Sequence, residues 1–387
     1  MAVQVCLVML VVAGTMGASK PVRKSRKAAA PKPKPDVSSI CIEAGTGLVI
    51  MEENADKQRP PASMVKMIQL LLVSEGLKAG KWTLETRIKV TPKAAAIGGT
   101  GIGLKETEEF PLGRMMQAVA VCSANDAAMA VAETLWGDEK TYLETANKRA
   151  LELDMKNTKF NSVHGLPPVP GGEFDASTAR DMARLAQFCV LDPAILGWTS
   201  QKELQFRPAD PVRKNTNRLL ETMAECDGLK TGFINSAGFC LTATAVRDGI
   251  RLISVVMGTT SNSNRFAESQ KALEAAFGQV TKKRVVAKGA PVGDPVPVAN
   301  CETPAISLTA ADDLWVVVKQ DDADKLEVAP QYPALIQAPL AAGAPVGRLN
   351  VQLAGKLLGT VALTAPVTLK EADLRWKLLN SLAMPRK

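Results

Sequence analysis

Residues 37–280 carry the hydrophobic spacings of both helices and strands. Apolar positions recur at helical spacing over residues 64–77, 125–136, 139–153, 178–190 and 263–277. Residues 38–51 have the pattern of a strand and turn, and alternating positions over residues 238–246 and 251–257 predict two strands around a turn at residues 247–249. This mixture predicts a domain built from both helices and strands.

After residue 280 the pattern changes. Residues 281–369 are rich in Val, Pro and Gly, and their short apolar runs are separated by turns, which predicts a small all-β domain. Residues 370–387 follow as a short amphipathic tail, with Leu374, Leu378 and Leu382 on one helix face and basic residues beside it. The tail is a candidate for peripheral membrane contact.

Residues 5–13 form an unbroken apolar run, followed by small residues. Such a run is typical of a secretory signal peptide and is too short to span a bilayer, although no Lys or Arg precedes it. We assign residues 1–18 as a signal peptide and expect an exported protein of the periplasm or cell envelope. Residues 19–36 then form a basic, Pro-rich, extended linker.

The chain of 387 residues is 46% hydrophobic and 22% charged, so it can bury a sizeable core. Its net charge of +8 comes mainly from residues 20–36, because the remaining 40 basic and 38 acidic residues leave a balance of +2. The basic excess therefore belongs to the linker, which we interpret as a solvated segment rather than as a contact for an anionic polymer.

Composition also excludes some functions. Two tyrosines and five tryptophans leave few rings for stacking on bases, so we expect no nucleic acid partner. His164 is the only histidine, which excludes a metal site with two or more histidines. Six cysteines follow the signal segment without a CxxC pair, and their apolar neighbours indicate buried thiols, with pairing left open: Cys41, Cys122, Cys189, Cys226, Cys240 and Cys301.

Three short motifs stand in order along the chain. Ser63 and Lys66 form an SxxK motif, Ser123 and Asn125 form an SxN motif, and residues 230–232 read Lys-Thr-Gly. Each motif alone is weak evidence, because short patterns recur by chance in a chain of this length. All three in this order are much less probable by chance. They therefore mark residues that we expect to meet in one site.

The first motif suits a serine nucleophile with a lysine base. Ser63 follows two prolines at the start of an apolar helical run, and Lys66 lies one turn later on the same face. A lysine can take the serine proton only when burial or a second cation lowers its pKa. Lys230 would supply that cation if the motifs meet, and it would also attract a substrate carboxylate. The helix start would disfavour charge on Lys66 and would aim the Ser63 N–H at a developing oxyanion.

The third motif lies in a segment that reads as a strand. On a strand Lys230 and Gly232 share one face, and the glycine would let an extended peptide lie along the edge as an added strand. The backbone N–H of Phe233 would be a second oxyanion donor. Ser123 and Asn125 can point into the same cleft, where they would shuttle a proton and hold a peptide group.

A purely structural interpretation exists for each motif. Ser123 can be the N-cap of a helix, Ser63 and Lys66 can be an exposed helix end, and residues 230–232 can belong to an ordinary hairpin. For the three motifs together we favour the catalytic interpretation.

The sequence resembles the low-molecular-mass penicillin-binding proteins of the serine D-alanyl-D-alanine carboxypeptidase type, which are peptidase S11-like. The resemblance covers residues 37–280 and rests on segments such as PPASMVKMIQLLL, AVCSANDAAMAVAE, NSVHGL and ECDGLKTGFINSAGFCLTATA. It implies an α/β (α+β) serine β-lactamase/transpeptidase-like domain, with an antiparallel sheet flanked by helices. Residues 281–369 and the tail are similar in kind to that family's small all-β second domain and membrane anchor.

The resemblance implies that the protein removes the terminal D-Ala from peptidoglycan stem pentapeptides through an acyl-enzyme, without cofactor or metal. It implies β-lactam antibiotics as covalent inhibitors. Ser63 would be the nucleophile and Lys66 the general base. Ser123 would relay the proton to the leaving amine, and Asn125 would bind the substrate amide.

The same resemblance implies a substrate-binding surface. Lys230, Thr231 and Arg265 would bind the terminal carboxylate of the peptide. Gly232 and Phe233 would form the strand edge beside which the peptide lies.

Two further residues look like supports of the cleft: His164 in NSVHGL and Asn217 in NRLL. For His164 we favour a structural, hydrogen-bonded loop histidine. Two positions depart from the family, since Ala124 stands where carboxypeptidases often have Gly, and Phe233 stands where some members have His. Both lie where substrate preference is set.

Three other functions stay open. A D,D-endopeptidase that cuts cross-links shares the motifs, and only the β-rich second domain favours the carboxypeptidase. A serine β-lactamase is less consistent, because no Glu between Asn125 and Lys230 has Asn four residues later, and the second motif begins with Ser123 rather than Tyr. A non-catalytic wall-binding protein would be expected to lack Ser63 or Lys66, and both are present.

Overall fold

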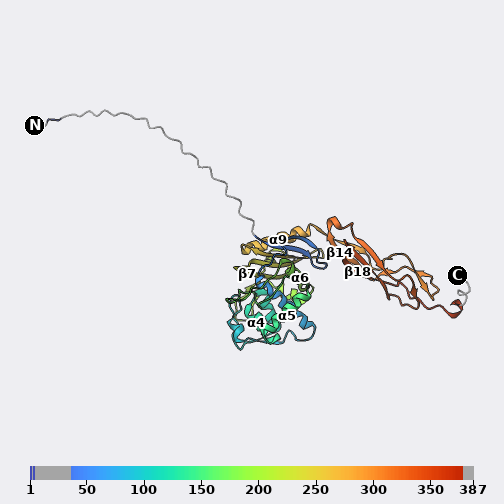
Figure 1. Cartoon of the computed structure of the whole chain (residues 1–387), viewed down its shortest axis with the longest axis horizontal. Coiled ribbons are helices and arrows are strands. Elements are labelled where there is room, and N and C mark those ends of the chain that lie inside the picture. Colours follow the sequence, from blue (N-terminus) through green and yellow to red (C-terminus); the bar gives the residue numbers. More distant parts are fainter. Residues whose placement is uncertain (2, 5–35, 378–387) are drawn as a thin grey trace. The chain divides into compact units, whose positions relative to one another are not determined.

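The computed structural model describes residues 1, 3–4 and 36–377 (Figure 1). Nearly all of the predicted signal peptide, the linker up to residue 35 and residues 378–387 of the tail lie outside the described residues. In the described part, no helix has the length and apolar character that a membrane crossing requires.

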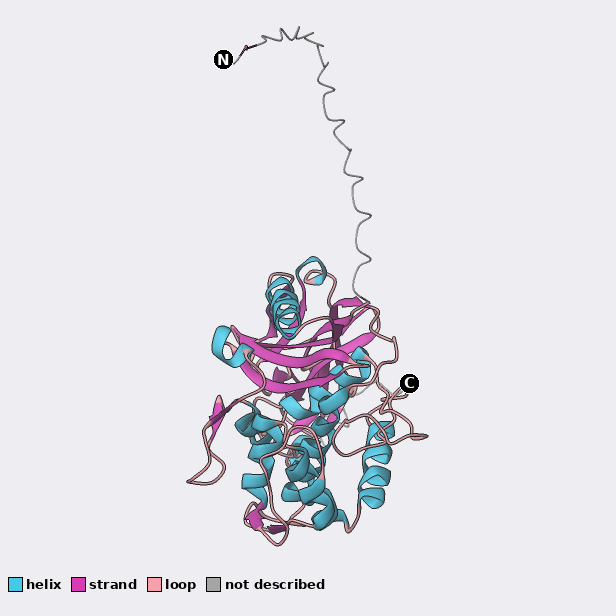
Figure 2. Cartoon of the chain, turned by 90° about the vertical axis from the view of Figure 1, so that its left-hand side faces the viewer, coloured by secondary structure: helices cyan, strands magenta, loops and turns pink. Residues whose placement is uncertain are grey.

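A five-stranded antiparallel sheet lies at the centre of the N-terminal part (Figure 2). Its order is β2-β1-β9-β8-β7, with bounds β1 Ser38–Glu43, β2 Val49–Glu53, β7 Cys226–Ile234, β8 Gly238–Arg247 and β9 Ile250–Thr259. Alternate residues of β1 enter different cores, because Ile40 and Ile42 join the larger core and Cys41 joins a smaller one. Both faces of the sheet are therefore covered, which explains the strongly apolar sequences of β8 and β9.

Helices supply both covering layers (Figure 2). Leu273 and Ala276 of α9 share the smaller core with Cys41, and α1, α4 and α6 contribute to the larger core. The helices are α1 Lys66–Lys78, α2 Pro92–Ala96, α3 Leu112–Gln117, α4 Asn125–Trp136, α5 Glu139–Glu152, α6 Ala179–Val190, α7 Pro193–Thr199, α8 Leu219–Thr222 and α9 Asn262–Phe277. The predicted mixed fold, an antiparallel sheet flanked by helices, is confirmed.

Four predicted helices, α4, α5, α6 and α9, begin and end within one residue of the predicted bounds. Three of them start after a side chain that accepts a hydrogen bond from a backbone N–H of the first turn. These capping residues are Asp138 before α5, Thr178 before α6 and Ser261 before α9. Such caps satisfy donors that have no partner inside the helix, which is why the sequence locates these starts well.

The helix predicted over residues 64–77 differs at its start. Residues 62–65 form a 3₁₀ turn, η1 Ala62–Val65, and the regular helix α1 begins only at Lys66. Ala62 has a φ of 50°, and Met64 N donates to the carbonyl oxygen of Pro61 at 3.2 Å. The N–H groups of Met64 and Lys66 both bond the carbonyl oxygen three residues earlier, the pattern of a 3₁₀ helix, so the regular helix α1 starts after this turn.

Short elements connect these layers. A π-helical turn, η2 Ala118–Cys122, leads from α3 towards α4. Two small strand pairs flank the same region: β3 Arg87–Lys89 with β4 Glu109–Pro111, and β5 Glu203–Leu204 with β6 Arg213–Lys214.

After α9 the chain is built mainly from strands, and the predicted small all-β domain is confirmed. Its strands are β10 Val280–Val286, β11 Val296–Ala299, β12 Ala305–Ile306, β13 Thr309–Ala310, β14 Leu314–Lys319, β15 Glu327–Gln331, β16 Ile336–Gln337, β17 Pro345–Leu353 and β18 Lys356–Thr364, with one 3₁₀ turn, η3 Gln320–Asp322. They have a core of their own that includes Leu308, Val351 and Leu363. Of the predicted tail, residues 374–377 are helical and Leu374 is exposed.

The six cysteines after the signal segment are free thiols in buried positions. Cys41 and Cys240 belong to the cores on the two faces of the sheet. The interpretation of these cysteines as small core residues is confirmed.

The η1 turn is held against a loop that contains Gly165. A Cβ on Gly165 would lie 2.2 Å from the carbonyl carbon and oxygen of Ala62 and 2.7 Å from Ser63 N. Gly165 also has a φ of 83°. Both its backbone conformation and this close contact therefore require glycine.

We expect Gly165→Ala to destabilise the protein more than Gly171→Ala. Gly171 has a similar φ of 86°, but a Cβ there would meet nothing within 4 Å. Both variants carry the cost of a left-handed alanine, about 1–2 kcal/mol. Only Gly165→Ala adds a steric conflict, which costs about 1–3 kcal/mol more. Urea unfolding measures both losses, and equal losses would show that backbone conformation alone explains the glycine.

Candidate active site

The structure brings the three motifs together. Lys66 Nζ, at the start of α1, donates to Asn125 Oδ1, at the start of α4, over 2.8 Å. β7, which carries Lys230, lies against η1, because a Cβ on Gly232 would be 2.5 Å from the carbonyl oxygen of Pro61. The missing side chain of Gly232 makes room for the turn that carries Ser63.

The Lys66 amine is fully buried and has three hydrogen-bond acceptors around it. Nζ donates to Ser63 Oγ at 3.0 Å, to Asn125 Oδ1 at 2.8 Å and to the carbonyl oxygen of His164 at 2.7 Å. Ser63 Oγ in turn donates to the same carbonyl oxygen at 3.2 Å. The serine hydroxyl and the lysine amine are therefore held in direct contact.

Burial is the main cause of the unusual basicity of Lys66. It lowers the pKa of Lys66 to about 7, whereas the negative charges of Asp175 and Asp126 act in the opposite direction. The sequence left burial and a second cation open as causes of a lowered pKa for Lys66, and burial is the cause that lowers it. Near neutral pH a substantial fraction of Lys66 is a free amine, which is the form that can accept the Ser63 proton.

Lys230 is almost as deeply buried, with 1% of its surface exposed. Its Nζ donates to the carbonyl oxygen of Thr231 at 3.1 Å. Burial lowers the pKa of Lys230 well below the usual lysine value, and the positive charges of Lys66 and Arg265 lower it further. Simultaneous positive charge on both lysines is therefore disfavoured.

A hydrogen-bond network that starts at Asp175 holds the loop whose His164 carbonyl oxygen faces Lys66. The Asp175 carboxylate accepts hydrogen bonds from Asn161 N at 2.7 Å, Ser162 N at 2.9 Å and Ser162 Oγ at 2.7 Å. Ser162 Oγ accepts one from Gly165 N at 2.8 Å. Asp175 and Gly165 were not among the residues predicted for the site. NSVHGL could have pointed to Gly165, whereas no local pattern marks Asp175.

The second motif contains a residue in an unfavourable conformation. Ser123 lies between η2 and α4 with φ 58° and ψ 31°, the left-handed region. Non-glycine residues in this region cost free energy and cluster at functional sites. The N-cap of α4 is Ala124, so the alternative interpretation of Ser123 as a helix cap does not hold. Asn125 Nδ2 donates to the carbonyl oxygen of Gly98 at 2.8 Å, which turns Asn125 Oδ1 towards Lys66.

The third motif lies on β7, which is an edge strand of the sheet. Thr231 Oγ1 donates to Thr216 Oγ1 at 2.8 Å. Phe233 is 46% exposed, and its ring stacks on Phe239 with 4.1 Å between the centroids. Among the described residues β7 therefore pairs with β8 alone within the sheet, and a stacked aromatic pair follows the motif.

Arg265 and Asn217 support β7 from the protein side. Arg265, in α9, donates from one terminal nitrogen to the carbonyl oxygens of Gly232 at 3.0 Å and Cys240 at 3.3 Å. Asn217 Nδ2 donates to the carbonyl oxygen of Gly228 at 2.9 Å. Both side chains thus bond to backbone carbonyl oxygens of β7, and Arg265 also bonds one of β8.

His164 contributes its backbone to the site. Its Nδ1 accepts a hydrogen bond from Leu166 N at 3.0 Å, and burial lowers the pKa of His164 to about 4. The ring is therefore neutral near pH 7 and forms part of the loop. Among the described residues, no group of three or more His, Cys, Asp and Glu side chains could hold a metal ion.

Two family models match the chain. Residues 26–261 match the peptidase S11 family of D-alanyl-D-alanine carboxypeptidases, and residues 281–371 match the C-terminal domain of penicillin-binding protein 5. The first match includes all three motifs and more than half of the chain.

Individual relatives span most of the sequence. D-alanyl-D-alanine carboxypeptidase DacF of Bacillus subtilis is 31% identical over 339 residues, which cover 87% of this chain and 86% of DacF. Penicillin-binding protein 5 from Haemophilus influenzae is 26% identical, with a TM-score of 0.70 and coverage of 89% of this chain and 100% of that one. Penicillin-binding protein D2 from Listeria monocytogenes, solved in an ampicillin-bound form, is 28% identical, with a TM-score of 0.56 and coverage of 62% and 96%. The extent of these matches shows that the chain is a serine peptidase of the D-alanyl-D-alanine carboxypeptidase family.

Proposed function

We propose that this D-alanyl-D-alanine carboxypeptidase uses Ser63 as its nucleophile and removes the terminal D-Ala of peptidoglycan stem pentapeptides through an acyl-enzyme. The observation that carries this proposal is the buried Lys66 amine, 3.0 Å from Ser63 Oγ, with Asn125 and the strand of Lys230 beside it. The match to the C-terminal domain of penicillin-binding protein 5 supports the carboxypeptidase over the endopeptidase alternative.

In the first step neutral Lys66 takes the proton of Ser63 while Ser63 Oγ bonds to the carbonyl carbon of the penultimate D-Ala. The direct contact between the two side chains supports a transfer without an intervening group. The carbonyl oxygen becomes an oxyanion, which the backbone N–H groups of Ser63 and Phe233 stabilise.

Collapse of this intermediate breaks the C–N bond and releases D-Ala. The leaving amine receives the proton from Lys66 through the hydroxyl of Ser123. Ser123 lies two residues before Asn125, whose Oδ1 accepts a hydrogen bond from Lys66 Nζ. Ser63 is then an ester and Lys66 is neutral again. A water molecule attacks the ester and gives its proton to Lys66, and the departing Ser63 oxygen recovers that proton.

Lys230 and Thr231 bind the terminal carboxylate of the peptide. Both lie on the edge strand β7, and Arg265 adds positive charge from behind that strand. A bound carboxylate also favours a proton on Lys230, because it supplies the opposite charge that this buried amine lacks. The Asn125 amide holds the substrate peptide group, with Gly232 and Phe233 along the strand edge.

β-Lactam antibiotics would acylate the same serine. The ampicillin-bound form of the Listeria monocytogenes relative supports this reading of the site. The chain has no Glu followed by Asn four residues later between Asn125 and Lys230, so we expect slow hydrolysis of the resulting ester.

We further propose that the protein is exported to the periplasm or cell envelope, with its tail in peripheral contact with the membrane. The apolar run at residues 5–13 and the amphipathic pattern of residues 370–387 support this location.

Ser63→Ala should abolish both peptide hydrolysis and acylation by benzylpenicillin, because it removes the only atom that forms the ester. Mass spectrometry of the intact protein detects the adduct, and peptide mapping locates it. Ser236→Ala, an exposed serine in the turn after β7, is the control and should be labelled like the wild type. An adduct that persists in Ser63→Ala would assign the nucleophile to another residue.

The rate of acylation should rise with pH and level off above a midpoint of about 7, because protonated Lys66 cannot accept the serine proton. Lys66→Arg should be as damaging as Lys66→Ala, by about 10²–10⁴-fold, since a guanidinium keeps its proton near neutral pH. Stopped-flow acylation across pH 5–9 measures the profile. Near-normal acylation by Lys66→Arg would rule out Lys66 as the base.

Amidating the C-terminal D-Ala of a model pentapeptide should lower kcat/KM by about 10- to 150-fold, the equivalent of a charge-assisted hydrogen bond of about 1.5–3 kcal/mol. Lys230→Gln should remove most of this difference between the free and amidated peptides. Equal cleavage of both peptides by the wild type would reject the carboxylate contact and favour the endopeptidase.

A further inference from the structure

A glycine-rich segment, residues 97–104, lies against the second motif. Asn125 N donates to the carbonyl oxygen of Thr100 at 2.7 Å, and Asn125 Nδ2 donates to the carbonyl oxygen of Gly98 at 2.8 Å. A Cβ on Gly99 would lie 2.7 Å from Asn125 Nδ2. The segment therefore determines which way the Asn125 amide points.

Asp126 holds this segment from the side of α4. Its carboxylate is buried and accepts hydrogen bonds from Ile102 N at 3.0 Å and Leu104 N at 3.1 Å. A Cβ on Gly101 would lie 2.8 Å from the same carboxylate. Glycine at position 101 is thus needed for the backbone to approach Asp126.

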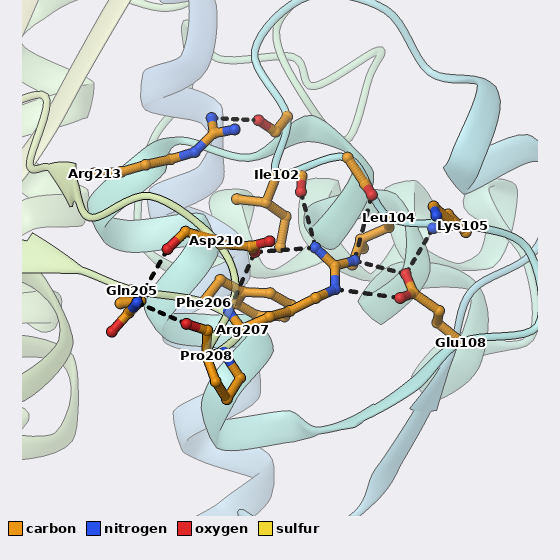
Figure 3. Close-up of polar contacts among 12 residues, drawn as sticks. Ile102, Leu104, Lys105, Glu108, Gln205, Phe206, Arg207, Pro208, Asp210 and Arg213 are labelled. Carbon is orange, nitrogen blue, oxygen red and sulfur yellow. Dashed lines mark hydrogen bonds and ion pairs between the residues drawn. The ribbon is translucent and has the colours of Figure 1, made fainter.

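Two arginines bind carbonyl oxygens of the same segment (Figure 3). Arg207 donates to the carbonyl oxygens of Ile102 at 3.2 Å and Gly103 at 3.3 Å, and Arg213 donates to that of Gly101 at 2.8 Å. Within residues 101–104, Asp126 therefore accepts hydrogen bonds from backbone N–H groups, and the two arginines donate hydrogen bonds to backbone carbonyl oxygens.

Arg207 is itself fixed in place. Its guanidinium bonds the Glu108 carboxylate at 2.6 and 3.2 Å and the Asp210 carboxylate at 3.1 Å. It also lies 5.3 Å from the ring centroids of both Phe110 and Phe206. Figure 3 shows this guanidinium between the carbonyl oxygens of the segment and Glu108. A planar group with so many fixed partners gives the segment a rigid support.

We propose that Arg207 is a positioning residue of the acylation step: together with Asp126 it fixes residues 101–104, and through the adjoining residues 98–100 it orients the Asn125 amide beside Lys66. This inference rests on the role given above to Asn125. If Arg207 only stabilised the fold, the effect of its substitution on acylation would be the same with and without the Asn125 side chain.

Arg207→Gln should therefore slow acylation by benzylpenicillin by about tenfold at saturating antibiotic, with little change in the apparent dissociation constant, because misplacement of a catalytic group affects the transition state most. In an Asn125→Ala background the same substitution should cost less than about twofold, since the group that transmits its effect is gone. Stopped-flow acylation of the four proteins completes this double-mutant cycle. Hydrogen exchange should quicken at the amides of Ile102 and Leu104 in Arg207→Gln.

Arg149→Gln is the matched control. Arg149 has a side-chain exposure of 25% against 22% for Arg207, and it also bonds two carboxylates and lies over an aromatic ring, that of Phe188. It touches no residue of the 97–104 segment, so Arg149→Gln should lower stability while acylation stays at the wild-type rate.

Equal slowing by Arg207→Gln with and without the Asn125 side chain would overturn the proposal, as would unchanged exchange at Ile102 and Leu104. If Arg207→Gln does not fold, Glu108→Gln weakens the same guanidinium more gently and should show the same dependence on Asn125. Wild-type protein without any benzylpenicillin adduct would instead contradict the proposed function. The exchange measurement would still decide whether Arg207 holds the segment.

Discussion

A lysine amine that loses all contact with water needs hydrogen-bond acceptors inside the protein, because an unpaired buried ammonium costs several kcal/mol. Lys66 finds three, and each comes from a different part of the fold: Ser63 from the η1 turn, Asn125 from α4 and the His164 carbonyl oxygen from the loop of residues 161–166. Most other features of the site keep those acceptors in place. Ala62 and Ser123, which lie close in the chain to Ser63 and Asn125, adopt positive φ values, and Gly165 lets its loop reach the turn that carries Ser63. The same burial makes the amine a weaker base, so that part of it is unprotonated near pH 7.

The site depends on the contact between a helical layer and the edge of a sheet. β7 holds Lys230 close enough to Lys66 for the positive charge of Lys66 to lower the pKa of Lys230. Gly232 allows the strand to contact the η1 turn. Buried carboxylates, Asp175 and Asp126, oppose the effect of burial on Lys66 and also hold the loops around it. The same two residues therefore determine both the positions of the loops and the pKa of Lys66. A substitution at either carboxylate changes both the position of a loop and the proton affinity of the base.

Much of the fold could be predicted from the sequence, since helix starts such as Asp138 and Thr178 carry local capping signals and β8 and β9 carry strand patterns. The three motifs likewise marked residues that meet in space. The remaining features depend on contacts between distant segments, which no local pattern records. The 3₁₀ turn before Lys66, the reason for Gly232 and the network of Asp175 became visible only when the neighbouring segments were in place. The glycine-rich segment 97–104 carries no catalytic side chain that the sequence could mark. Its role depends on hydrogen bonds from Leu104 N to Asp126 and from Arg207 to the carbonyl oxygen of Ile102.

The two buried lysines connect recognition with catalysis. The positive charge of Lys66 lowers the pKa of Lys230, so the pair favours a single positive charge. In the proposed mechanism the substrate carboxylate binds beside Lys230 and supplies a negative charge there. That charge favours a proton on Lys230, and the repulsion between the lysines then favours the free amine of Lys66. Substrate binding would thus move the shared charge away from the base at the moment when Ser63 must lose its proton. A chain end without a carboxylate would occupy the cleft without producing this redistribution.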